Sequence, residues 1–389
     1  MTFSDQVQHA VELKNALVDY VDSPRFVPIL QARIAAVRPY VASNDDAWTQ
    51  AAEELLFTVG AAGTRTLVQR FLDVATGLTV DDEDLLTAWR DDNVYGLFLV
   101  TARDNELLQL DNLIDGMTYE AFVPEGADAT RTSPRGSYLQ ARLLPVGPAW
   151  ITSGSLTVFP ARDRLKVGSM VARLLAFDPT AAFRNPANLA RAVDLADSQH
   201  AIFRSLFGSD VVTGTGIALQ EQFHTYLAAC DSAEESAAVA GIPGKAHTAF
   251  TATATVGEFP IELLDSDDVA IISHPLRGIT FATDYRVLDT AHGGSGSAGG
   301  SAVLNRYLDD PAMPASVLRG LAAKHPTGVD ALYRTALDRP GFTWADDGEA
   351  LLQERKPDSF VDVDLPAIAL LPPIALESVG AVRPASTSR

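Results

Sequence analysis

The sequence predicts an α+β protein with a helical N-terminal part, a small antiparallel β-barrel-like domain and a mixed α/β C-terminal part. Apolar residues recur every three or four positions through residues 1–92, which is the period of an amphipathic helix. From residue 93 the pattern changes to short alternating runs between turn residues, which indicates strands. Helical spacing returns after residue 160 and is interrupted by a few further strands.

These changes of pattern divide the chain into four segments. The 389 residues are enough for two or three domains, since a domain holds roughly 100–200 residues. We expect a helical domain over residues 1–92, a small β domain over 93–160, a mixed domain of helices and strands over 161–357, and a Pro-rich, extended tail over 358–389.

The N-terminal segment carries regular helical spacing. Helices are predicted over residues 4–21, 26–37, 48–59, 64–75 and 81–89. The last of these begins with four consecutive acids, residues 81–84, which suit the positive end of a helix dipole. Adjacent acids diverge around a helix axis, so we prefer this interpretation to a metal site.

The β segment is divided by turn residues. Residues 93–113 predict a hairpin with its turn at 103–105, and Asp115-Gly116 marks a second turn. Two or three more strands follow over 137–159, interrupted by Gly147-Pro148. About five short strands in so short a segment favour a small antiparallel barrel.

The C-terminal segment mixes both periods. Asn185-Pro186 is a favourable helix start and Gly208 a favourable end, and His200 on the apolar stripe between them is expected to be a packed core histidine. Further elements are expected over residues 217–227, 249–256, 269–273, 278–284, 302–308, 315–324 and 329–337.

Composition limits the classes of partner. The chain has 50 acidic and 30 basic residues, a formal net charge of −20. Nucleic acid is therefore disfavoured as a partner, and so is an anionic membrane surface. No stretch approaches the roughly 18 apolar residues that cross a bilayer. Residues 1–14 lack the features of a signal peptide, so we expect a cytoplasmic protein.

The sequence contains no clear cofactor or metal motif. Cys230 is the only cysteine, which excludes an intrachain disulfide and a thiolate metal site. Gly294, Gly296 and Gly299 match the spacing GxGxxG, but they lie in the run HGGSGSAGGS, whose composition is that of a flexible linker, native or introduced. We expect no cofactor and no bound metal.

A second acidic group also has a structural interpretation. Asp346, Asp347 and Glu349 lie within four positions around a glycine, a pattern that can hold a hard cation. The other positions of a calcium-binding loop are missing. We therefore expect a turn that caps a helix over residues 349–354.

His274, Arg277 and Asp284 are the catalytic candidates. His274 follows one predicted strand, Asp284 closes the next, and Arg277 lies between them. A His–Asp pair beside an arginine can act as a general base or bind an anion. Turns use the same residue types, and a structural turn is the preferred interpretation.

Two segments, residues 93–159 and 185–210, resemble parts of uncharacterised bacterial proteins of actinobacterial type. The similarity rests on GSYLQARLLPVGPAW, ITSGSLTVFP and the helical run RNPANLARAVDLADSQHAIFRSLFGSD. Some of those proteins carry a SEC-C zinc motif. The resemblance implies a small β domain and no specific activity, and zinc binding is not carried over because the motif's cysteines are missing here.

Three functions remain open at this point. The first is a non-catalytic protein-interaction or regulatory protein with an unidentified protein partner. The second is a hydrolase or transferase with a site at His274, Arg277 and Asp284, joined by Asp346 or Glu349. The third is single-stranded nucleic-acid binding by the β domain through stacking side chains and nearby arginines. Those residues are Tyr95, Phe98, Tyr119, Phe122, Tyr138, Arg131, Arg135 and Arg142.

Overall fold

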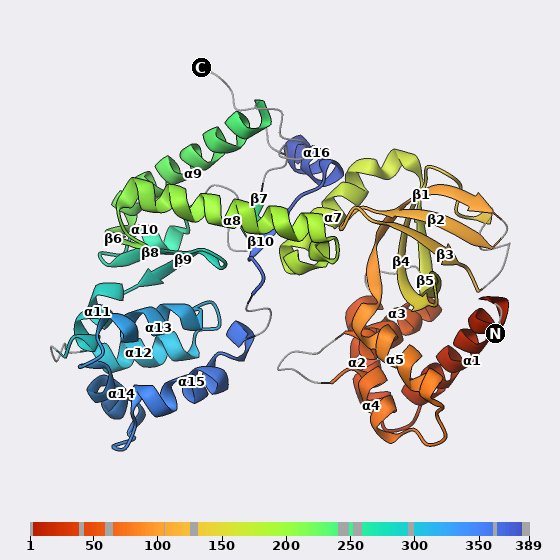
Figure 1. The fold of residues 1–389 in the computed structure, drawn as a ribbon, viewed down its shortest axis with the longest axis horizontal. Helices are drawn as coiled ribbons and strands as arrows, with labels where there is room; N and C mark the ends of the chain where they lie inside the picture. Colours follow the sequence, from red (N-terminus) through yellow and green to blue (C-terminus); the bar gives the residue numbers. More distant parts are fainter. Residues whose placement is uncertain are drawn as a thin grey trace. The chain divides into compact units, whose positions relative to one another are not determined.

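The computed structural model describes residues 3–38, 43–58, 65–104, 106–124, 131–239, 249–251, 259–294, 299–360 and 364–382. The chain forms two compact units (Figure 1). Unit 1 comprises Met1–Arg173 and Pro372–Arg389, and unit 2 comprises Leu174–Leu371. Helices and strands lie in separate layers of each unit, which confirms the predicted α+β class.

Unit 1 begins with a group of helices. They are α1 (Phe3–Val21), α2 (Val27–Val37), α3 (Asn44–Phe57), α4 (Leu67–Val74) and α5 (Val80–Asp92). The acids at 81–84 lie at the start of α5, as the sequence predicts, and Asp82 forms a reciprocal capping box with Thr79. The side chain of Ser43 caps α3 in a similar way by accepting a hydrogen bond from the backbone of Asp46.

A closed barrel follows these helices. Its strands are β1 (Val94–Asp104), β2 (Leu107–Asn112), β3 (Thr118–Phe122), β4 (Tyr138–Val146) and β5 (Ala149–Phe159), in the order β1-β2-β3-β5-β4. All neighbouring pairs are antiparallel except β3 and β5, which run parallel and close the barrel. The prediction of a purely antiparallel barrel is thus wrong for this pair. The strand order is that of an OB-type barrel.

The predicted helical and β segments share one core. Inward-facing residues of the barrel, such as Phe98 and Leu139, form a cluster of their own. On the outer face of β4 and β5, Leu144 and Ile151 belong instead to the cluster formed by the helices. The indole of Trp89 on α5 also donates to the carbonyl oxygen of Pro145 at 2.9 Å. The helices and the barrel therefore fold as a single unit.

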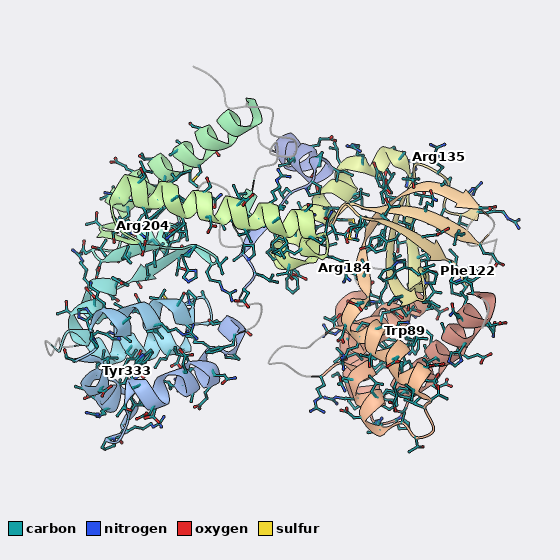
Figure 2. All side chains as sticks on the ribbon, viewed as in Figure 1. Trp89, Phe122, Arg135, Arg184, Arg204 and Tyr333 are labelled. Atoms are coloured by element: carbon teal, nitrogen blue, oxygen red, sulfur yellow. The ribbon has the colours of Figure 1, made fainter. Side chains whose placement is uncertain are left out.

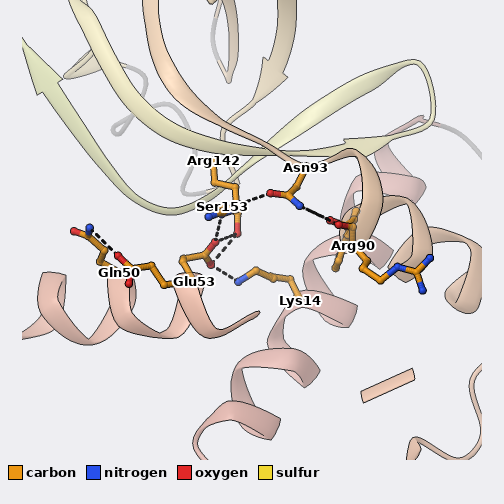
Figure 3. A network of polar contacts seen from close by, with 9 residues as sticks. Lys14, Gln50, Glu53, Arg90, Asn93, Arg142 and Ser153 are labelled. Carbon is orange, nitrogen blue, oxygen red and sulfur yellow. Dashed lines mark hydrogen bonds and ion pairs between the residues drawn. The ribbon is translucent and has the colours of Figure 1, made fainter. Parts of the chain in front are cut away.

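A buried polar network crosses this helix–barrel contact (Figure 3). The Glu53 carboxylate accepts hydrogen bonds from Lys14 Nζ at 2.6 Å and from the Ser153 hydroxyl at 3.0 Å. Arg142 Nε lies 3.4 Å from the second carboxylate oxygen. The Arg142 guanidinium also contacts the Asn93 side chain. Burial lowers the pKa of Arg142, although the Glu53 charge acts in the opposite direction.

Unit 2 contains a small sheet between two groups of helices (Figure 1). The sheet has the order β6-β8-β9, with β6 (Val211–Gly214), β8 (Val269–His274) and β9 (Gly278–Thr283). The helices are α8 (Pro186–Phe207), α9 (Gly216–Val239), α10 (Ile261–Leu264), α11 (Tyr285–His292), α12 (Gly300–Asp309), α13 (Ala315–Lys324), α14 (Val329–Leu337) and α15 (Trp344–Arg355). As predicted, α8 begins after Asn185 and ends at Gly208, which has left-handed backbone.

The two faces of this sheet pack against different helices. Val269 and Ile271 join a cluster with residues of α8 and α9. Ala270 and Ile272, which alternate with them on β8, join the cluster of α11 to α15. Side chains of a strand alternate between its faces, so Ser273 is directed to the α8 face and His274 to the α11–α13 face.

Several further elements complete the two units. They are the 3-10 helices Ala161–Asp163, Pro179–Arg184 and Pro357–Phe360, helix α7 (Arg164–Phe177), strands β7 (Ala249–Thr251) and β10 (Ile368–Leu370), and helix α16 (Pro373–Val382).

The C-terminal segment is not the extended tail that its prolines suggested. Strand β10 pairs with β7 in unit 2, and α16 packs in unit 1. Arg164 on α7 binds Glu377 on α16 through paired contacts of 2.8 Å. Gly168 allows the close approach of these helices, because an added Cβ would lie 2.2 Å from the Ile374 carbonyl oxygen. Residues 383–389 lie outside the described part of the chain.

Candidate functional site

The structure separates the predicted catalytic residues. His274 ends β8 beside the hairpin turn, whereas Asp284 directly follows Thr283, whose partner Val269 begins β8. At a rise of about 3.3 Å per residue, His274 and Asp284 are on the order of 20 Å apart along the hairpin. His274, Arg277 and Asp284 do not form one site, because the two ends of a hairpin lie far from each other.

Asp284 has a structural position at the start of α11. Its backbone is left-handed, with φ 58°, and its carboxylate accepts a hydrogen bond from Arg306 at 2.8 Å. Arg277 lies in the turn at the opposite end, where its backbone N–H contacts His274. The contacts of Asp284 and His274 fit the turn interpretation that the sequence favoured.

His274 is placed to donate a hydrogen bond. Its Nδ1 accepts from the backbone N–H groups of Leu276 and Arg277, at 3.2 Å each. Burial, assisted by the charge of Arg277, lowers the pKa of His274, so the ring is neutral near pH 7. The backbone occupies its only acceptor nitrogen, which leaves Nε2–H as a donor and not as a base.

A second polar group on the α8 face resembles a catalytic triad. His200 Nδ1 lies 2.9 Å from the Ser273 hydroxyl, and His200 Nε2 lies 3.6 Å from Asp210. Asp210 also pairs with Arg204, which is labelled in Figure 2, at 3.3 Å. Ser273 is 5% exposed and is directed toward α8. These residues therefore attach the sheet to α8, and His200 is hydrogen-bonded, as expected of a packed histidine.

The sheet borders a cleft of about 500 Å³ on the side of α11 and α13, and Asp210 and Ser273 also reach its lining. We call it the sheet–helix cleft; its other walls are α11 and α13. Val211, Ile272 and Val317 supply apolar surface. Its lining residues with polar side chains are Ser209, Asp210, Thr213, Ser273, His274, Thr280, Tyr285, Arg286, Asp289, Ser316 and Lys324. Most of the lining side chains are therefore polar, and polar groups that converge on a concave surface can fix the orientation of a small molecule.

Several polar groups in this cleft have unused hydrogen-bonding capacity. Within the described chain, the hydroxyl groups of Thr213, Thr280, Tyr285 and Ser316 have no hydrogen-bond partner in the protein. The Nε2–H group of His274 likewise has none. Burial raises the pKa of Tyr285 to about 12, so its hydroxyl remains a donor at neutral pH. These groups from five elements are available to water or to a ligand.

The charged groups beside the cleft are already paired. Lys324 Nζ lies 2.7 Å from the Asp289 carboxylate, which also contacts His325 at 2.8 Å. Arg286 Nε lies 3.0 Å from Asp268. The cleft therefore presents neutral donors and acceptors rather than an unneutralised charge.

Gly320 keeps the α13 side of the cleft open. A Cβ added to this residue would meet nothing within 4 Å, so no packing contact in the structure requires glycine. Glycine in a helix interior costs roughly 0.5–1 kcal/mol relative to alanine. The observable consequence of Gly320 is additional space in the cleft.

Three of the five side chains predicted to stack on bases are buried in the barrel. Phe98, Tyr119 and Tyr138 are at most 4% exposed, so their faces cannot stack on bases. Arg142, one of the predicted cations, is buried beside Glu53. OB-type barrels bind oligonucleotides on the β2–β3 face, but here the side chains of that face include Asp111 and Glu120, which repel phosphate.

The remaining candidate motifs have structural roles or lie partly outside the described residues. Asp346 and Asp347 accept hydrogen bonds from the hydroxyl and backbone N–H of Thr343, so they do cap a helix. That helix, α15, begins at Trp344 and not at Glu349, and the two acids lie in its first turn. Glu349 pairs with Arg319. Within the described part of the chain, no group of three or more His, Cys, Asp or Glu side chains could hold a metal ion. Residues 295–298 of the Gly/Ser run are not described.

No protein-family model, curated protein or solved structure matches this chain. The resemblance to proteins associated with SEC-C motifs therefore stays a prediction. No helix among the described residues has the length and apolar character needed to span a bilayer.

Among the residues that line the cleft, His274 is the one that the sequence analysis named as a site candidate. Thr213, Thr280 and Ser316 are isolated hydroxyl residues in distant segments, and no local motif links them. Gly320 in the middle of an amphipathic helix was the one local signal, since helix interiors disfavour glycine.

Proposed function

We propose that the chain is a non-catalytic regulatory protein that binds a small, uncharged molecule rich in hydroxyl or amide groups in the sheet–helix cleft. The observation that carries this proposal is the set of unpartnered hydroxyl groups around a cleft that Gly320 keeps open. A ligand with matching donors and acceptors would replace water and would cover the apolar surface of Ile272 and Val317.

The charge of the ligand follows from the charges beside the cleft. Lys324 and Arg286 already bind carboxylates, so an anion would have to compete with Asp289 or Asp268. A cation would have to compete with Lys324 or Arg286 for the same two carboxylates. An uncharged ligand avoids the cost of burying an unpaired charge.

A binding role is preferred to catalysis for two reasons. His274 lacks a free acceptor nitrogen, so it cannot remove a proton from a substrate. The hydroxyl of Ser273 contacts His200 on the other face of the sheet. Ser273 reaches the cleft lining beside His200, but it is only 5% exposed, which disfavours attack on a bound substrate.

Calorimetric titration of the intact chain tests the proposal with ribose, myo-inositol and uridine as uncharged probes. Ribose 5-phosphate and uridine 5′-monophosphate are the charged counterparts. We expect binding of at least one uncharged probe, weaker binding of its phosphorylated form, and loss of binding in Gly320→Leu, whose side chain fills the cleft. Thr280→Val should weaken binding by about tenfold, the effect of one lost hydrogen bond.

Thr335→Val is the matched control, because its exposed hydroxyl on α14 bonds only within the helix. The proposal is overturned if no uncharged probe binds, if the phosphorylated form binds more tightly than its parent, or if Gly320→Leu binds as the original chain does.

A further inference from the structure

A second concave surface lies in unit 1, on helices α1, α2 and α4 and the turn between α1 and α2. We call it the N-terminal hollow; its volume is about 430 Å³, and it is lined by Tyr20, Arg25, Phe26, Ile29, Arg70, Asp73 and Val74. It is unrelated to the sheet–helix cleft, since every lining residue belongs to unit 1.

The hollow exposes apolar side chains. Ile29 is 52% exposed and Val74 is 54% exposed, although both belong to helices that have a buried face. Beneath them, the Tyr20 ring contacts the rings of Phe26 and Phe71 at 5.1 Å each. The aromatic base is thus packed and rigid, whereas the aliphatic rim is available to a partner.

The hollow also carries positive charge that the protein does not neutralise. The Arg25 guanidinium lies 4.3 Å from the Tyr20 ring and 4.6 Å from the Phe26 ring. Neither Arg25 nor Arg70, both exposed, pairs with a carboxylate within the described chain. The one acid of the hollow, Asp73, is already held by Arg65 at 2.7 Å and by Gln69 at 2.8 Å.

We infer that the N-terminal hollow binds a short peptide segment of a partner protein, in which carboxylates flank an exposed apolar side chain. The carboxylates would pair with Arg25 and Arg70, and the apolar side chain would cover Ile29 and Val74. Arginine binds carboxylates in bidentate geometry, and stacking on Tyr20 and Phe26 fixes the position of Arg25.

A second copy of the chain is a less suitable occupant. Two chains of net charge −20 repel each other. A stable dimer also buries about 800 Å² on each partner, whereas a hollow of about 430 Å³ accommodates only a few side chains. Charge and size therefore both favour a peptide segment.

The test is selection of a random 12-residue peptide phage library on the intact chain, followed by affinity measurement of the selected peptides by fluorescence anisotropy. We expect enrichment of peptides with Asp or Glu beside Leu, Ile or Phe. In Arg25→Ser/Arg70→Ser, affinity should fall about tenfold or more, because two charge-assisted contacts are lost. Ile29→Ser should also weaken binding.

The matched control is Arg135→Ser/Arg162→Ser, which removes the same charge from exposed positions elsewhere in unit 1 and should leave affinity unchanged. Four results would overturn the inference, and the first three come from the peptide measurements. They are the absence of enriched acidic–apolar peptides, equal affinity for the hollow variant and the control, or displacement of the peptides by labelled oligo-dT. Sedimentation equilibrium provides a fourth, if the original chain dimerises and Ile29→Ser is monomeric.

Discussion

The Lys14 ammonium lies 2.6 Å from the Glu53 carboxylate, and this contact joins α1 to α3 beneath the barrel (Figure 3). Glu53 is at the same time the nearest counter-charge of Arg142, whose guanidinium lies between the rings of Phe57 and Tyr95 at 5.0 and 5.2 Å. The exposed fractions of the Lys14, Glu53 and Arg142 side chains are 14, 10 and 8%. One carboxylate therefore compensates two buried cations.

Glu53→Ala should destabilise unit 1 strongly. Removal of one partner from a buried ion pair costs about 3–5 kcal/mol, because the other charge is left uncompensated. Urea unfolding followed by tryptophan fluorescence measures the loss, since Trp48, Trp89 and Trp150 all lie in unit 1. The control is Asp91→Ala, which removes a surface pair with Arg90 in the same unit and should cost at most about 1 kcal/mol. Equal losses in the two variants would contradict the proposed role of Glu53.

Two glycines should respond to alanine with opposite signs. Gly154 has φ +74°, and an added Cβ would lie 2.6 Å from Glu53 Cγ. Gly154→Ala should therefore lose at least the roughly 1–2 kcal/mol of a left-handed alanine. Gly320 lies inside α13 with nothing within 4 Å of an added Cβ, so Gly320→Ala should gain about 0.5–1 kcal/mol. Thermal unfolding of both variants checks the signs, and a stabilised Gly154→Ala would refute the close approach to Glu53.

Local patterns predicted much of the fold. The change of period at residue 93 corresponds to the junction where α5 ends at Asp92 and β1 begins at Val94. Asp115-Gly116 does form the β2–β3 turn, because the Asp115 carboxylate accepts from the backbone of Met117 at 2.8 Å. Such signals succeed because capping and turn formation depend on residues close together in the sequence.

Long-range relationships were beyond those patterns. Closure of the barrel by β3 and β5 depends on side-chain packing between distant strands, and Glu53 contacts Ser153 across the sequence. The predicted tail was wrong because Pro373 begins α16, a helix position that tolerates proline. The separation of His274 and Asp284, in contrast, follows from hairpin geometry once β8 and β9 are known to pair.

The stability of unit 2 should fall as the pH decreases below about 6.5. His292 is fully buried, and this burial lowers the pKa of its ring. The charge of His325 lowers the pKa further. The hydrogen bond to Leu288 and the charge of Asp289 raise it, but only in part offset the effect of burial. The unfolded chain, with an ordinary histidine pKa near 6.5, then binds a proton that the folded chain does not. Stability must therefore rise with pH in this range, by up to about 1.4 kcal/mol per pH unit for each such histidine.

Urea unfolding of the intact chain between pH 7 and pH 5, followed by Trp344 in a background without the other tryptophans, measures this slope. His292→Asn should reduce it, and His274→Asn should do so to a smaller extent because His274 is only partly buried. The exposed His224 on α9 provides the control, and His224→Asn should keep the slope. An unchanged slope in His292→Asn would show that this ring is not the group responsible.

The contact between His200 and Ser273 should stabilise unit 2 as a hydrogen-bonded pair and not as a catalytic one. Ser273→Ala should cost about 1 kcal/mol, the typical net value of one hydrogen bond. His200→Phe and the double variant complete a mutant cycle, in which the two losses should not add, since either substitution removes the same contact. Additive losses would mean that the pair does not interact.

An assay of p-nitrophenyl acetate hydrolysis tests the catalytic alternative. A nucleophilic Ser273 would be favoured if the original chain hydrolyses this ester and if both single variants lose the activity without losing stability. Its burial at 5% exposure and its orientation toward α8 argue against that outcome.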